Sequence, residues 1–163
     1  MALFQWKNAR SMATVSVLTA ALGSAGVAQT PVPGLGTWKL NVAKSKNSPG
    51  PVAKSGTVTF STVGQGVKAV IDVVGPDGGK AHWEYTANFD GKPYPVTGNP
   101  DGDRVVAKRV NANTIETSYS LKGKPTVVNT RVVSADGNTL TVTTTGTNAQ
   151  GQKVSSVLVF DKG

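Results

Sequence analysis

The sequence predicts an all-β protein, a single up-and-down antiparallel β-barrel of about eight to ten strands preceded by a signal peptide. Hydrophobic and polar residues alternate over short segments, and turn residues separate these segments at almost every break. No segment after residue 28 combines helical periodicity with helix caps. A β-sandwich is the main alternative, but its crossings need several long connections, and only segments 43–54 and 90–103 are long enough.

Nine or ten segments are expected to be strands, joined by loops of about two to five residues, which make neighbouring strands antiparallel. The clearest is 80–89, in which Trp83 and Tyr85 share one face and His82 and Glu84 share the other. These strands form a barrel domain at 37–162, after a lead-in at 29–36 that is rich in Pro and Gly. The other expected strands are 37–42, 56–62, 67–74, a very short one at 94–97, 104–110, 115–121, 126–134, 139–147 and 153–161.

Residues 1–28 have the pattern of a secretory signal peptide. Lys7 and Arg10 precede the uncharged stretch 12–28, which ends in the small residues Gly26-Val27-Ala28. The pattern predicts cleavage after Ala28 and a periplasmic or secreted protein. An uncleaved membrane anchor is the alternative, although the stretch is short for a bilayer that needs about 20 strongly apolar residues. Once the signal is removed, no membrane insertion is expected.

Composition excludes several classes of protein. The chain of 163 residues has no Cys and one His, which excludes disulfides, iron–sulfur clusters, cysteine nucleophiles and zinc centres built from several histidines. We therefore expect no metal site and no cofactor. The net charge is +8, but the basic residues are scattered in pairs such as Lys44 with Lys46 and Lys122 with Lys124. Nucleic-acid binding needs a concentrated basic stripe, so a nucleic-acid partner is not expected.

Function depends on whether the barrel is hollow. Ten strands lined by modest side chains would leave room for a ligand, whereas a flattened barrel whose walls meet would need none. Arg109 and Arg131 also fall on strands; each is either an inward-facing clamp for a ligand or a sign that the predicted register is wrong by one residue. The residues expected to bind the ligand are Phe60, Ile71, Trp83, Tyr85, Arg109, Tyr119 and Arg131. The rest of the interior is expected to comprise Val67, Val73, Phe89, Ile115, Leu121, Leu140, Val142, Leu158 and Phe160.

The opening of the barrel, 36–41 (GTWKLN), resembles the start of calycin-superfamily barrels, the lipocalins and cellular fatty-acid-binding proteins. The chain also resembles small exported bacterial lipocalin-like proteins of unknown function, through TWKLN, HWEYTANFDGK, YPVTGNPDGD and GTNAQGQ. The resemblance implies a lipocalin-like barrel with Trp38 at its closed end and a late basic residue, Arg131 or Lys153, packed on it. The last strand is apolar where fatty-acid-binding proteins carry an Arg and a Tyr for the ligand carboxylate, and their helical lid is missing.

Other polar residues have two possible interpretations. His82 and Glu84 lie side by side on one strand, where they would share a proton or a ligand, or simply form an exposed polar face. Asp101 and Asp103 suggest an oxygen-rich calcium loop or an Asp turn, and the ligand spacing of a helix–loop–helix calcium site is absent. Tyr94, between two prolines, is part of a cavity mouth or a packed turn anchor. We expect no catalytic residue.

The sequence thus favours an exported, monomeric, non-enzymatic binding protein that carries a small hydrophobic or amphipathic molecule in a barrel cavity. The alternative is an extracytoplasmic protein-interaction module, an inhibitor-like barrel that acts through 29–36 and 90–103. An enzyme is a third possibility, which would depend on His82, Glu84 or Asp103 for acid–base chemistry.

Overall fold

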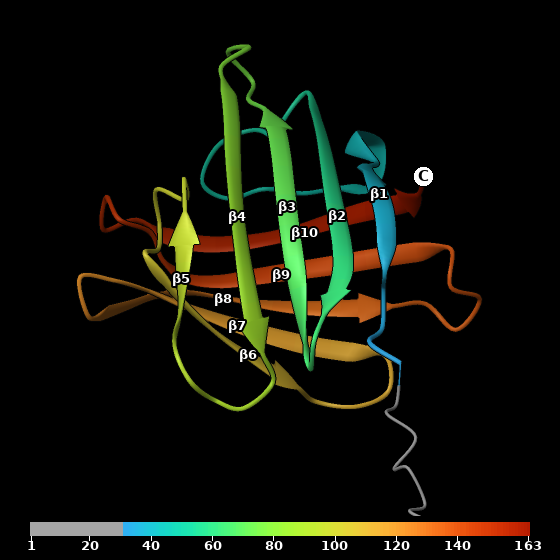
Figure 1. Ribbon diagram of the computed structural model, residues 1–163. Coiled ribbons are helices and arrows are strands. Elements are labelled where there is room, and N and C mark those ends of the chain that lie inside the picture. The colour runs from blue at the N-terminus through green and yellow to red at the C-terminus, as the bar shows by residue number, and fades with distance from the viewer. Residues whose placement is uncertain (1–30) are drawn as a thin grey trace, which may run out of the picture.

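The computed structural model describes residues 31–163, and these residues form a closed barrel of ten antiparallel strands in chain order (Figure 1). The first strand pairs with the last, which closes the barrel, so the prediction of an up-and-down barrel is confirmed and the β-sandwich alternative is wrong. The predicted signal peptide, 1–28, lies outside the described residues. The strands are β1 (Gly36–Leu40), β2 (Ser55–Val63), β3 (Gly66–Val74), β4 (Lys80–Asn88), β5 (Tyr94–Thr97), β6 (Arg104–Arg109), β7 (Thr114–Leu121), β8 (Lys124–Val133), β9 (Thr139–Thr147) and β10 (Lys153–Lys162).

The two halves of the barrel cross each other. Figure 1 shows β1–β4 in front, with β6–β10 running across them behind. We call β2–β4 the front wall and β7–β10 the back wall. A short 3-10 helix, η1 (Val42–Lys44), follows β1, and the segment after it is held along β10 by backbone hydrogen bonds between Lys46 and Val157.

The hairpin between β7 and β8 sets the register of the back wall. Lys122 and Gly123 have φ values of 51° and 76°, which suit a two-residue turn whose twist matches the flanking strands. A register shift next to Ser118 and Ser120 follows on the same hairpin. Such bulges increase the local twist of a strand. The prediction that Leu121 faces the interior is wrong, since this residue ends β7, is only half-buried and lies outside both the core and the cavity lining.

One end of the barrel is packed solid around Trp38, which is 0% exposed. The Trp38 indole Nε1 donates a hydrogen bond to the Gly34 carbonyl at 2.8 Å. The ammonium of Lys162 lies 4.9 Å from the centroid of the Trp38 ring, because the two residues are direct cross-strand partners. The expectation that Arg131 or Lys153 packs on this ring is wrong. The other residues at 0% exposure are Val67, Ala69, Ala87, Val105, Ala107 and Leu140.

Candidate ligand-binding site

A cavity of about 340 Å³ lies between the front and back walls. It extends to the end of the barrel opposite Trp38, where Asn47 and Ala53 from the segment after η1 and Asn99 to Asp101 from the loop after β5 line it. Pockets for small molecules start at about 300 Å³. The barrel is hollow, so the flattened alternative is wrong.

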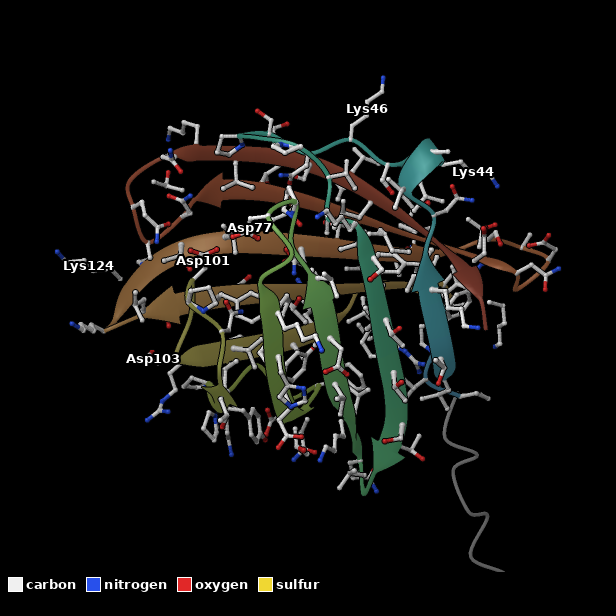
Figure 2. The ribbon with its side chains drawn as sticks, turned by 90° about the horizontal axis from the view of Figure 1, so that it is seen from above. Lys44, Lys46, Asp77, Asp101, Asp103 and Lys124 are labelled. Carbon is white, nitrogen blue, oxygen red and sulfur yellow. The ribbon has the colours of Figure 1, made fainter. Side chains whose placement is uncertain are left out.

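The loop at the mouth of this cavity is held by hydrogen bonds from the back wall. The Asp101 carboxylate accepts from the Ala149 amide at 2.9 Å, and the Asp101 carbonyl accepts from the Thr126 hydroxyl at 2.6 Å. The Asp103 carboxylate accepts from the Lys122 amide at 3.0 Å. These two carboxylates therefore serve as turn acceptors. Figure 2 shows them on the side of the barrel from which Lys124 projects outward.

Both walls contribute apolar and aromatic side chains to the lining of the cavity. Six of the predicted ligand-binding residues line the cavity, and that they contact a ligand stays a prediction. They are Phe60, Ile71, Trp83, Tyr85, Tyr119 and Arg131. The front wall also contributes Gly56, Val58, Val73 and Ala81, and the back wall contributes the apolar residues Ile115, Val127, Val142, Val154, Leu158 and Phe160.

Arg131 reaches from β8 across the interior to the front wall. Its side chain is buried, with 6% of the residue exposed, and its Cζ lies 3.7 Å from the centroid of the Phe60 ring on β2. Because Arg131 points inward, the predicted register is correct at this residue, and the alternative of a one-residue error is wrong. Burial lowers the pKa of Arg131, while the neighbouring phenols of Tyr85 and Tyr119 act in the opposite direction. Arginine stays protonated in proteins, so a cation is buried in the cavity.

The donors of this cation are not satisfied by the protein. Its Nε and Nη2 atoms are buried and have no hydrogen-bond partner among the described residues. No ion pair within residues 31–163 involves it. A buried charge without a partner is costly, and these two atoms form the edge of the guanidinium that binds carboxylates through two parallel hydrogen bonds. The arrangement can accept an anion.

Two tyrosines lie beside the guanidinium. The rings of Tyr85 and Tyr119 meet edge to face, with centroids 6.2 Å apart. Burial raises the pKa of both hydroxyls, and the positive charge of Arg131 opposes this effect. Both phenols are therefore neutral at physiological pH and supply hydroxyl groups rather than negative charge next to Arg131.

Polar side chains cross the back wall in one row, which sequence reasoning missed. Thr117, Asn129, Thr144 and Ser156 are successive cross-strand partners on β7, β8, β9 and β10, and all four line the cavity. We call them the polar row. The Asn129 Oδ1 atom is buried without a hydrogen-bond partner. Ser156 donates to Asn47 at 2.6 Å. The signal was available, because Asn129 lies two residues before Arg131 and shares its face.

Arg109 is placed differently. It lies on the inward face with Val105 and Ala107, so the suspected register error is wrong here too. Its guanidinium lies 6.0 Å from the centroid of the Phe89 ring and donates to the Pro31 carbonyl. Arg109 does not line the cavity, and the expectation of a ligand clamp at this residue is not supported.

The remaining polar candidates have local partners. On β4, His82 contacts Asp72 at 2.7 Å and Glu84 contacts Lys68 at 2.9 Å, all with exposed side chains. The hydrogen bond from Lys68 lowers the pKa of Glu84. His82 and Glu84 thus belong to an exposed polar face, which was one of the two interpretations of this pair.

Tyr94 donates to the Asp90 carboxylate at 2.8 Å and packs against the core, as a turn anchor does. Within residues 31–163 there is no group of three or more His, Asp or Glu residues that could hold a metal ion. Among the same residues, no helix has the length and apolar character needed to cross a bilayer.

Comparison with known proteins adds a likeness to a solved structure. No protein-family model matches the sequence, and no curated protein matches it significantly. Among solved structures, the chain is similar to the zebrafish ileal bile acid-binding protein, described in a complex with cholic acid. The two are 12% identical, with a TM-score of 0.41 over 78% of this chain and 96% of the other.

Proposed function

We propose that this protein is an exported, monomeric, non-enzymatic carrier of a small amphipathic molecule that bears one anionic group. The single observation that carries this proposal is the buried, unpartnered edge of Arg131 inside a cavity of about 340 Å³. The signal-like segment 1–28 supports export to the periplasm or to the medium.

The anion would bind to the Nε and Nη2 edge of Arg131. A carboxylate, sulfonate or phosphate oxygen pair matches the two parallel donors of that edge. The apolar part of the ligand would then lie against Phe60, Ile71 and Trp83. Burial of apolar surface contributes roughly 25 cal/mol per Å², which is the main source of affinity in such a cavity.

The experiment compares palmitate with hexadecanol, which keeps the chain and lacks the charge. Binding is measured by calorimetry and by the fluorescence of Trp83. We expect the protein to bind palmitate at least about tenfold more tightly than the alcohol, because hydrogen bonds to charged groups contribute about 1.5–3 kcal/mol. Arg131→Met should abolish this preference and keep the binding of the alcohol.

The matched control is Arg104→Met, because Arg104 is exposed and lies outside the cavity lining. This variant should bind both compounds as the unchanged protein does. If neither compound binds the protein, or if Arg131→Met retains the preference for palmitate, the proposed function is wrong.

A further inference from the structure

We propose that the ligand is hydroxylated along one side: its hydroxyl groups face the polar row and its apolar side faces the front wall. This inference rests on the proposed function and narrows its substrate class from amphipathic anions in general to hydroxylated acids. It starts from the difference between the two walls of the cavity. The front-wall lining is apolar and aromatic, with Val58, Ile71, Val73 and Trp83. The back-wall lining is also largely apolar, but the polar row interrupts it.

The polar row lies close to the anion site. Arg131 and Asn129 are two residues apart on β8, so their side chains leave the strand about 7 Å from each other on the same face. From Asn129 the row continues across two more strands to Ser156, at about 4.8 Å per strand. We therefore expect a ligand with its anion on Arg131 and a chain as long as that of palmitate to lie along the polar row with the first half of that chain.

The row is built to be hydrogen-bonded from inside the cavity. The Asn129 Oδ1 atom is a buried acceptor without a partner, so it requires a donor that the protein does not provide. The hydroxyls of Thr117 and Thr144 on either side can donate and accept. A plain alkyl chain laid along the row would remove these groups from water without replacing their hydrogen bonds. A ligand hydroxyl replaces them, so the row selects for hydroxylated ligands and against plain ones.

The test compares palmitate with a palmitate that carries two neighbouring hydroxyls in the middle of its chain. Two new hydrogen bonds to buried groups correspond to about tenfold tighter binding of the dihydroxy acid, even though this acid is the less hydrophobic of the two. Dissociation constants are measured by calorimetry on the same protein preparation. Equal affinities, or tighter binding of plain palmitate, would overturn the inference.

Variants assign the preference to the row. Asn129→Leu and Thr144→Val should each remove most of the preference for the dihydroxy acid while palmitate still binds, which also shows that the variants are folded. Thr143→Val is the matched control: it makes the same change one residue away, on the outer face of β9, and should keep the preference. A preference that survives in the Asn129→Leu, Thr144→Val double variant would place its origin elsewhere and refute the inference. If neither acid binds the unchanged protein, the proposed function itself fails.

Discussion

The two ends of the barrel are built on different principles. At the closed end, Trp38 and its neighbours are fully buried, and the indole is held by Gly34 and covered by Lys162. Between this end and the mouth, a cavity replaces packed side chains, and Arg131, in its deep part, and Asn129 hold polar atoms without partners. The comparison teaches that this molecule gains stability from the packed end and sacrifices some of it at the polar groups that line the cavity.

The largest expected effect tests the closed end. Trp38→Ala should lower the free energy of unfolding by about 3–5 kcal/mol, since it removes the largest fully buried side chain and leaves a void. Trp83→Ala should cost roughly half as much, because Trp83 is only partly buried and already faces the cavity. Urea denaturation measures both. Equal losses would mean that the two ends contribute alike to stability.

The second prediction is a gain in stability rather than a loss. Arg131→Met should raise the free energy of unfolding of the ligand-free protein by about 1–2 kcal/mol, because it replaces an unpartnered buried charge with an apolar side chain of similar reach. The contact between the guanidinium and the Phe60 ring offsets part of this gain. The same urea experiment applies, with Arg104→Met as the reference. A less stable Arg131→Met protein would contradict the view that the buried charge in the cavity lowers the stability of the fold.

A third variant tests how the mouth loop is held. Asp101→Ala removes the acceptor of the Ala149 amide, and we expect faster hydrogen exchange of that amide and faster ligand dissociation. The loss of stability should be about 1 kcal/mol, the usual net value of one hydrogen bond. Asp101→Asn keeps an acceptor oxygen and is the matched control. Unchanged exchange in the alanine variant would show that the other hydrogen bonds hold the loop alone.

The smallest effect concerns the outer surface. Because the pKa of Glu84 is lowered in the folded protein, its interaction with Lys68 stabilises the fold above the ordinary pKa of a glutamate and is lost as the pH falls through the lowered value. Glu84→Gln should therefore reduce stability slightly at neutral pH, less than any change above, and the difference should vanish in acid. Thermal melts across this pH range measure it. Ligand affinity should not change in this variant. A changed affinity would show that the outer face of β4 contributes to ligand binding.

The strands were predictable because each carries its own alternation and its own turn residues. Segments 94–97 and 139–147 match the observed strands residue for residue, and most other boundaries differ by one residue. The interior of β8 was not predictable in this way. Its alternation gives Val128 and Val132 on one face, and Val127 and Val133 on the face of Asn129 and Arg131, so hydrophobicity alone does not decide which face is inside.

Pairing with neighbouring strands decides the face of β8 instead. Arg131 pairs with the buried Ile115 on β7 and with Val142 on β9, which places it inside. The residue that covers Trp38 was missed for a similar reason. Lys162 reaches the ring only because the last strand returns to the first, and a single sequence shows this closure but not its register.

The pairing of β1 with β10 also has a kinetic consequence. The two strands that close the barrel are separated by nearly the whole described chain. The closing step therefore joins its most distant strands and follows all the local hairpins. Until β10 is synthesised, β1 and β9 both present unpaired backbone edges. A chain that is truncated before β10 thus has two exposed strand edges that can pair with other chains and aggregate.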